Sequence, residues 1–189
     1  MTTTWESGPV SVADLNSRIR DPIEQLLNPP GCRRAVKANV FVAANSWALL
    51  RFEPPGQGAG KASSFDSTGS MMSDSPTRVT APLDGLYEVN AGLVMSAADL
   101  NGRMGYARAA VGKGLSEPAR FDTEAFVKFG LNRITAGCRS GAGTATIPLR
   151  AGEWVSLAAW ADASWVTADR RENAASASFL ELSWVGDLP

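Results

Sequence analysis

The chain has 189 residues, enough for one domain of ordinary size with a short appendage. Its hydrophobic share of 44% and charged share of 20% are those of a globular protein and argue against intrinsic disorder. A net charge of −1 argues against nucleic-acid binding, and no stretch approaches the roughly 20 apolar residues that cross a bilayer.

The first 31 residues differ from the rest of the chain. Ser11, with Asp14 three residues later, predicts a helix start with a variant of the capping box. Asp21-Pro22 predicts two short helices or one kinked helix, because proline fits only the first turn. Asn28-Pro29-Pro30-Gly31 then predicts the end of the helix and a short, stiff hinge. The chain therefore divides into a helical docking segment with a Pro-Pro hinge, residues 1–31, and a β-domain, residues 32–189.

An amphipathic stripe runs along the predicted helix, because apolar residues recur there at spacings of three and four. One such helix is not stable alone in water, so the stripe must pack on the chain's own β-domain, on copies of the chain or on another protein. The Pro-Pro hinge sets the helix apart and favours docking or oligomerisation. The candidate docking and oligomerisation residues are Trp5, Leu15, Ile19, Ile23, Leu26 and Leu27.

From residue 32 onward the sequence has the composition and alternation of β-strands. The clearest strand alternates apolar and polar residues from Tyr87 to Met95, and Asn45 and Asn101-Gly102 are predicted hairpin turns. Eight strands without helices between them predict an all-β jelly-roll sandwich of about eight strands with a short N-terminal helical segment. These strands are expected at residues 36–43, 46–52, 87–95, 103–111, 125–131, 144–149, 154–161 and 175–185.

The aromatic residues are skewed toward tryptophan, with six tryptophans against two tyrosines, which suits a sheet core or a buried subunit interface. The residues predicted for core or interface are Tyr87, Trp154, Trp160 and Trp184. Trp165 is expected in an exposed loop between two strands, as a candidate receptor contact that stacks on a glycan. Core or interface packing is the favoured alternative for Trp165.

Histidine is absent, which removes the commonest general base, the commonest metal ligand and the usual partner of a nucleophile. Cys32 and Cys138 have no metal-ligand spacing, and two buried free thiols are favoured over a disulfide. Turn caps are favoured over a calcium site for the loop carboxylates Asp66, Asp74, Asp84 and Asp99. No spacing suggests the carboxylate pair of a glycosidase. We therefore expect no enzyme activity, no cofactor and no metal.

Three segments of the β-domain follow one another in a familiar order. Residues 80–89 (Thr-Ala-Pro-Leu-Asp-Gly-Leu-Tyr-Glu-Val) are similar to the motif aP-x-x-G-x-Y-x-v, and residues 149–157 (Leu-Arg-Ala-Gly-Glu-Trp-Val-Ser-Leu) to l-x-x-G-D-x-V-x-l. Phe179-Leu180-Glu181-Leu182 is similar to the closing strand s-F-x-G-x-l, although Glu181 stands where a small residue is usual. In this order they resemble the complement-type globular heads and tumour-necrosis-factor-like jelly rolls, a resemblance that covers about residues 33–186.

The N-terminal segment carries a second resemblance. Trp5-Glu6-Ser7-Gly8, residues 12–16 and Ile19-Arg20-Asp21 are similar to W-x-x-G-x-x-v-t-A-x-x-l-N-x-x-i-R-D, the opening of small virion proteins from phages of actinobacteria. Residues 65–80 resemble their later segment f-D-t-x-x-m-h-x-x-x-x-P-s-R-l-t, but Met72 or Ser73 stands in place of its histidine. Any role tied to that histidine does not carry over.

These resemblances imply a minor tail protein, a virion component assembled in the host cytoplasm, and a jelly roll that trimerises. The small residues Ala158, Ala159 and Ala161 suit tight subunit packing. The implied partners are the chain itself, other virion proteins and a host cell-surface glycan, without nucleic acid or membrane insertion. The first hypothesis is a homotrimer on the tail that contributes to host attachment. The alternative is a capsid decoration protein that docks on the phage shell and stabilises it.

Overall fold

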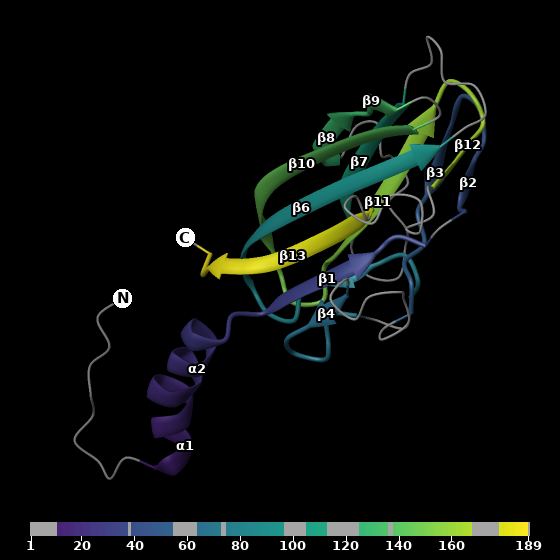
Figure 1. Ribbon diagram of the computed structural model, residues 1–189. Coiled ribbons are helices and arrows are strands. Elements are labelled where there is room, and N and C mark those ends of the chain that lie inside the picture. The colour runs from purple at the N-terminus through teal and green to yellow at the C-terminus, as the bar shows by residue number, and fades with distance from the viewer. Residues whose placement is uncertain are drawn as a thin grey trace.

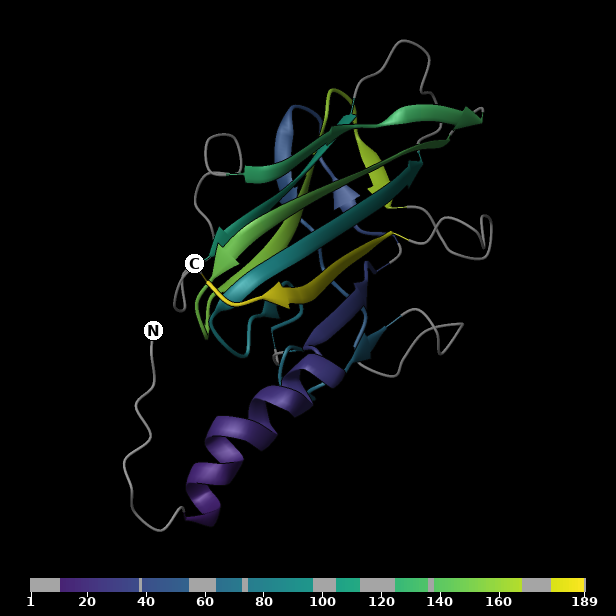
Figure 2. The same ribbon diagram turned by 90° about the vertical axis from the view of Figure 1, so that its left-hand side faces the viewer.

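The computed structural model describes residues 11–37, 39–54, 64–72, 75–96, 105–112, 125–135, 138–167 and 178–188. Within them a helical arm precedes a β-sandwich, and the two views of Figures 1 and 2 show the arm extending away from both sheets. None of the described helices is long and apolar enough to span a membrane.

The arm is a single helical run with one wide turn in its middle. It consists of α1 (Val12–Leu15), the π-helical segment η1 (Asn16–Arg20) and α2 (Asp21–Leu27). The predicted capping box is confirmed, since the Ser11 hydroxyl accepts from the Asp14 N–H at 3.1 Å and the Asp14 carboxylate accepts from the Ser11 N–H at 3.2 Å. Pro22 does not split the run into two helices. Proline has no N–H to donate to the carbonyl four residues earlier, and a wide turn is one way in which a helix adjusts to the missing hydrogen bond.

The β-sandwich has more strands than the predicted eight, because several are only two to four residues long. An eight-stranded sheet contains the order β2-β12-β6-β13-β1-β4, with β10 beside β6 and β9 beside β10. A four-stranded sheet has the order β5-β11-β7-β8. All pairings between these strands are antiparallel, and the prediction of an all-β jelly-roll sandwich with a short N-terminal helix is confirmed. The strands are β1 (Gly31–Ala35), β2 (Phe41–Val42), β3 (Ser46–Leu49), β4 (Phe65–Asp66), β5 (Val79–Thr80), β6 (Gly85–Ser96), β7 (Gly105–Gly112), β8 (Ala125–Gly130), β9 (Asn132–Thr135), β10 (Cys138–Leu149), β11 (Trp154–Ala161), β12 (Trp165–Thr167) and β13 (Phe179–Gly186).

Among the described strands, β6 and β11 contribute the most buried apolar residues to the core. The predicted alternation of β6 is confirmed, because its apolar residues from Tyr87 to Met95 are buried while Glu88 and Asn90 on the other face are partly exposed. The near-continuous apolar run of β11 is buried on both faces, as predicted. Its outward Ala158 is covered by Trp47 and Leu49 from β3.

The turn at Asn45 was predicted correctly, and the hairpin around it is found at its base, where Val36 and Phe52 form an antiparallel bridge. Asn45 has a positive φ of 56°, as a tight turn requires. The two flanking strands separate, however: β2 pairs with β12 in the eight-stranded sheet, whereas β3 lies against β11. A turn fixes only the local chain reversal, and the choice of partner depends on residues more than 100 positions away. The second predicted hairpin, Asn101-Gly102, lies outside the described residues.

One edge of the sandwich is closed by the passage of the chain from β8 in one sheet to β9 in the other. Leu131 between these strands is buried. β10 comes so close to β8 there that a Cβ on Gly141 would lie 2.3 Å from the Gly130 carbonyl oxygen. On Gly143 it would lie 2.9 Å from Phe129. The two glycines therefore permit the closure.

Candidate functional site

The apolar stripe of the arm is exposed to solvent. Its side chains are 42–74% exposed, so the helix does not fold its apolar face back onto the β-sandwich, which was one of the open alternatives. The stripe comprises Val12, Leu15, Ile19, Ile23, Leu26 and Leu27, that is, five of the predicted docking residues and one more. The sixth predicted residue, Trp5, lies outside the described residues.

The wide turn keeps the stripe on one side of the helix. Leu15, Ile19, Ile23 and Leu27 are spaced by four, and in a regular α-helix each such step drifts by about 40° around the axis. A π-helical turn holds more residues, so η1 offsets this drift. Covering the exposed parts of the stripe would contribute about 5–10 kcal/mol per helix before the cost of association. A helix this short gains its stability mainly from such contacts.

The joint between helix and sandwich is held by hydrogen bonds on two sides. The Ser67 hydroxyl accepts from the Gly31 N–H at 2.8 Å and lies 3.4 Å from the Pro29 carbonyl oxygen. The Ser67 N–H donates to the Gly31 carbonyl at 2.9 Å, and the Trp184 N–H donates to the Pro30 carbonyl at 2.8 Å. The predicted Pro-Pro hinge is therefore a stiff joint that continues directly into β1.

Two further exposed apolar side chains flank this joint. Phe65 of β4 is 46% exposed and lies against Gly31, where a Cβ would be 3.5 Å from its ring. Val185 is 54% exposed at a bulge that ends β13, next to Trp184. Neither could be predicted from the sequence, because their places depend on strand pairing. Val12 could have been found, since it precedes Leu15 by three residues on the same stripe.

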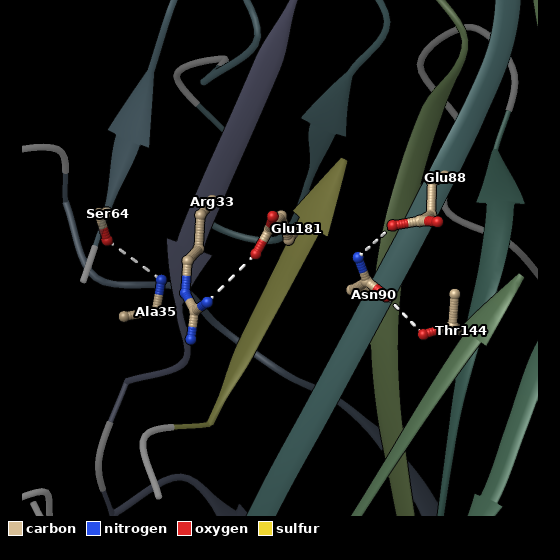
Figure 3. Close-up of polar contacts among 7 residues, drawn as sticks. All are labelled: Arg33, Ala35, Ser64, Glu88, Asn90, Thr144 and Glu181. Atoms are coloured by element: carbon tan, nitrogen blue, oxygen red, sulfur yellow. Dashed lines mark hydrogen bonds and ion pairs between the residues drawn. The ribbon is translucent and has the colours of Figure 1, made fainter. Parts of the chain in front are cut away.

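The outer face of the eight-stranded sheet carries polar side chains (Figure 3). Arg33 on β1 pairs with Glu181 on β13 at 3.1 Å, and its guanidinium lies 3.8 Å over the Phe179 ring. Beside them, the Asn90 amide donates to Glu88 at 2.9 Å and accepts from the Thr144 hydroxyl. The side chains of Arg33 and Glu181 are only 31% and 23% exposed. This row holds one ion pair and the Glu88 carboxylate, which accepts from an amide, and it is suited to contact with another polar surface.

The loop carboxylates that the structure describes serve as turn caps, as favoured by the sequence. Asp66 accepts from the N–H groups of Thr68, Gly69 and Met72 at 2.8–3.0 Å, and Asp84 accepts from the Ala151 N–H at 2.8 Å. Among the residues with described side chains, no group of three His, Cys, Asp or Glu residues could hold a metal ion. Asp74 and Asp99 lie outside the described residues.

The prediction that Trp165 is an exposed receptor contact was wrong. Its side chain is 1% exposed because it belongs to β12, which is hydrogen-bonded between β2 and β6, and it packs in the core. Trp165 is therefore too buried to stack on a glycan, and the alternative, core packing, is confirmed. Of the other predicted core or interface residues, Tyr87, Trp154 and Trp184 are buried within the chain itself and Trp160 is partly exposed.

Cys32 is a buried free thiol, and burial raises its pKa to about 12. The strand register keeps it away from Cys138. Cys32 is aligned through Leu182 and Val89 with Ala145, seven residues along β10 from Cys138, which is a backbone separation of about 20 Å. A disulfide needs Cα atoms within about 7 Å, so these two residues form none within one chain.

In comparisons with known proteins, no protein-family model matches the chain, and no curated protein matches its sequence.

Proposed function

We propose that this chain is a non-enzymatic structural protein of a bacteriophage particle, a homotrimeric jelly roll on the tail that contributes to host attachment. The observation that carries the proposal is the arm: an exposed apolar stripe on a helix that a stiff joint holds away from a complete β-sandwich. A chain built this way has one end for assembly and one for display.

The resemblances found in the sequence supply the setting. The order of the segments around Tyr87, Trp154 and Phe179 is similar to trimeric jelly rolls, and the residues around Ile19 are similar to the opening of actinobacterial phage virion proteins. The fold agrees with the first of these. On the polar sheet face, Arg33 and Glu181 pair within the chain, so this pair presents no net charge to repel a copy.

The number of copies per virion tests the proposal against capsid decoration. Quantitative mass spectrometry of purified particles, with the major capsid protein as the internal standard, measures this number. A few trimers per particle are expected for a tail protein, and purified chain should then bind host cells. One copy for every few capsid subunits would instead place the chain on the shell as a decoration protein. Absence from purified virions would overturn both.

A further inference from the structure

Apolar side chains remain exposed on both sides of the joint: the helix stripe on one side, and Phe65 and Val185 on the other. We propose that further copies of this chain cover them, so that three helices pack in parallel about one axis and the ends of the sandwiches nearest the joint meet beside them. This inference rests on the homotrimer of the proposed function and assigns the surface that holds it together.

The size of the stripe argues that the contact between copies extends beyond the helices. It offers on the order of 200–400 Å² of apolar surface, whereas a stable pair buries about 800 Å² on each partner. Two stripes alone therefore fall short. In a three-fold arrangement each stripe contacts two neighbours, and Phe65 and Val185, which flank Gly31 and Pro30, extend the contact onto the sandwich.

The charges along the stripe favour a copy of the same helix. Counted through the wide turn of η1, Arg18 borders one edge of the stripe, and Arg20 and Glu24, which pair at 2.9 Å, border the other. In a parallel ring of helices in register, one edge meets the opposite edge of the neighbour, which places Arg18 of one copy opposite the Arg20–Glu24 pair of the next. Helices that bind a lipid surface have a basic polar face. This helix also carries the acidic residues Asp14 and Asp21, so its charges do not fit that partner.

The stiff joint makes the two contacts cooperate. Because Ser67 and Trp184 bond the backbone from Pro29 to Gly31, the segment that carries the helix leaves the sandwich along one path in each chain. Helices that pack about an axis therefore place the sandwiches in one arrangement. If the helix were freely hinged, helix packing would not orient the sandwiches. Association would then carry the additional entropic cost of ordering them.

The test places a charge on the stripe of the full chain and an equal charge away from it. Ile19→Glu puts a carboxylate in the proposed contact, and Ala13→Glu puts one on an exposed position on the other side of the helix. Sedimentation velocity over a concentration series measures the association of each. The wild type and Ala13→Glu are expected to sediment as three chains, and Ile19→Glu to associate at least about 100-fold more weakly. Unchanged thermal unfolding of the sandwich, followed by tryptophan fluorescence, shows that Ile19→Glu is folded.

Two results would overturn the inference, and they have different consequences for the homotrimer. If Ile19→Glu forms trimers as tightly as the wild type, the stripe does not hold the assembly, although a trimer through the sheet face survives. If the wild type is a single chain at every concentration, the self-association falls altogether. A place in the virion is measured independently by the copy number, so it can stand or fail separately.

Discussion

Arg34 places a full charge in the interior, and no carboxylate of the described residues pairs with it. Its guanidinium donates to the carbonyl oxygens of Ser75 and Arg78 at 2.8 Å and of Glu53 at 3.3 Å, and burial lowers its pKa. Arg34→Met would leave these carbonyl groups short of a donor, so we expect a loss of about 2–4 kcal/mol in the free energy of unfolding. Urea unfolding followed by tryptophan fluorescence measures it. Arg33→Met, at a partly exposed surface pair, is the control and should cost under about 1 kcal/mol.

The stability of the fold at alkaline pH depends on two buried acids. Burial raises the pKa of the Cys32 thiol and of the Tyr87 hydroxyl to about 12, from ordinary values of 9.0 and 10.0. The folded chain therefore holds two protons that the unfolded chain releases first, so stability is full below pH 9 and falls as the pH rises toward 12. Unfolding free energies measured from pH 8 to 11 should show this decline. Tyr87→Phe, which also removes the hydrogen bond to the Leu83 carbonyl, should make the decline above pH 10 shallower. An unchanged slope would contradict the assignment.

At the scale of the elements, the close approach of β10 to β8 depends on glycine. A Cβ on Gly141 would meet the Gly130 backbone at 2.3 Å, and backbone cannot swing aside as a side chain can. Gly141→Ala should therefore destabilise the sandwich by about 1–3 kcal/mol. Gly130→Ala is a matched control on the facing strand, because a Cβ there has no atom within 4 Å. Thermal unfolding compares the two variants, and equal melting temperatures would show that β8 yields without cost.

The elements that the sequence predicts well are those with local signals. The capping box of Ser11 and Asp14, the helix stripe and the alternation of β6 each depend on residues a few positions apart. The failures involve distant partners. The turn at Asn45 does not indicate whether β2 pairs with β3 or with β12. The burial of Trp165 was missed because the three residues of β12 are too few to show the alternation of a strand. Five stripe residues of the candidate site were predictable in this way, whereas Phe65 and Val185 were not, because strand pairing brings them to the joint.

At the scale of the whole molecule, the joint should matter more to assembly than to folding. Ser67→Ala removes the hydroxyl that accepts from the Gly31 N–H and contacts the Pro29 carbonyl, but it keeps the backbone bond from Ser67 to Gly31. Its cost to the sandwich should stay near about 1 kcal/mol. Self-association should weaken by a larger factor than this local loss predicts, because a looser helix must be ordered anew when the copies meet. Ser70→Ala is the control, since among the described residues the Ser70 hydroxyl bonds to the Thr68 hydroxyl of the same exposed turn and to no part of the joint. Sedimentation of the three proteins over one concentration series decides the matter: if Ser67→Ala associates like Ser70→Ala, the stiffness of the joint does not couple the helix to the sandwich.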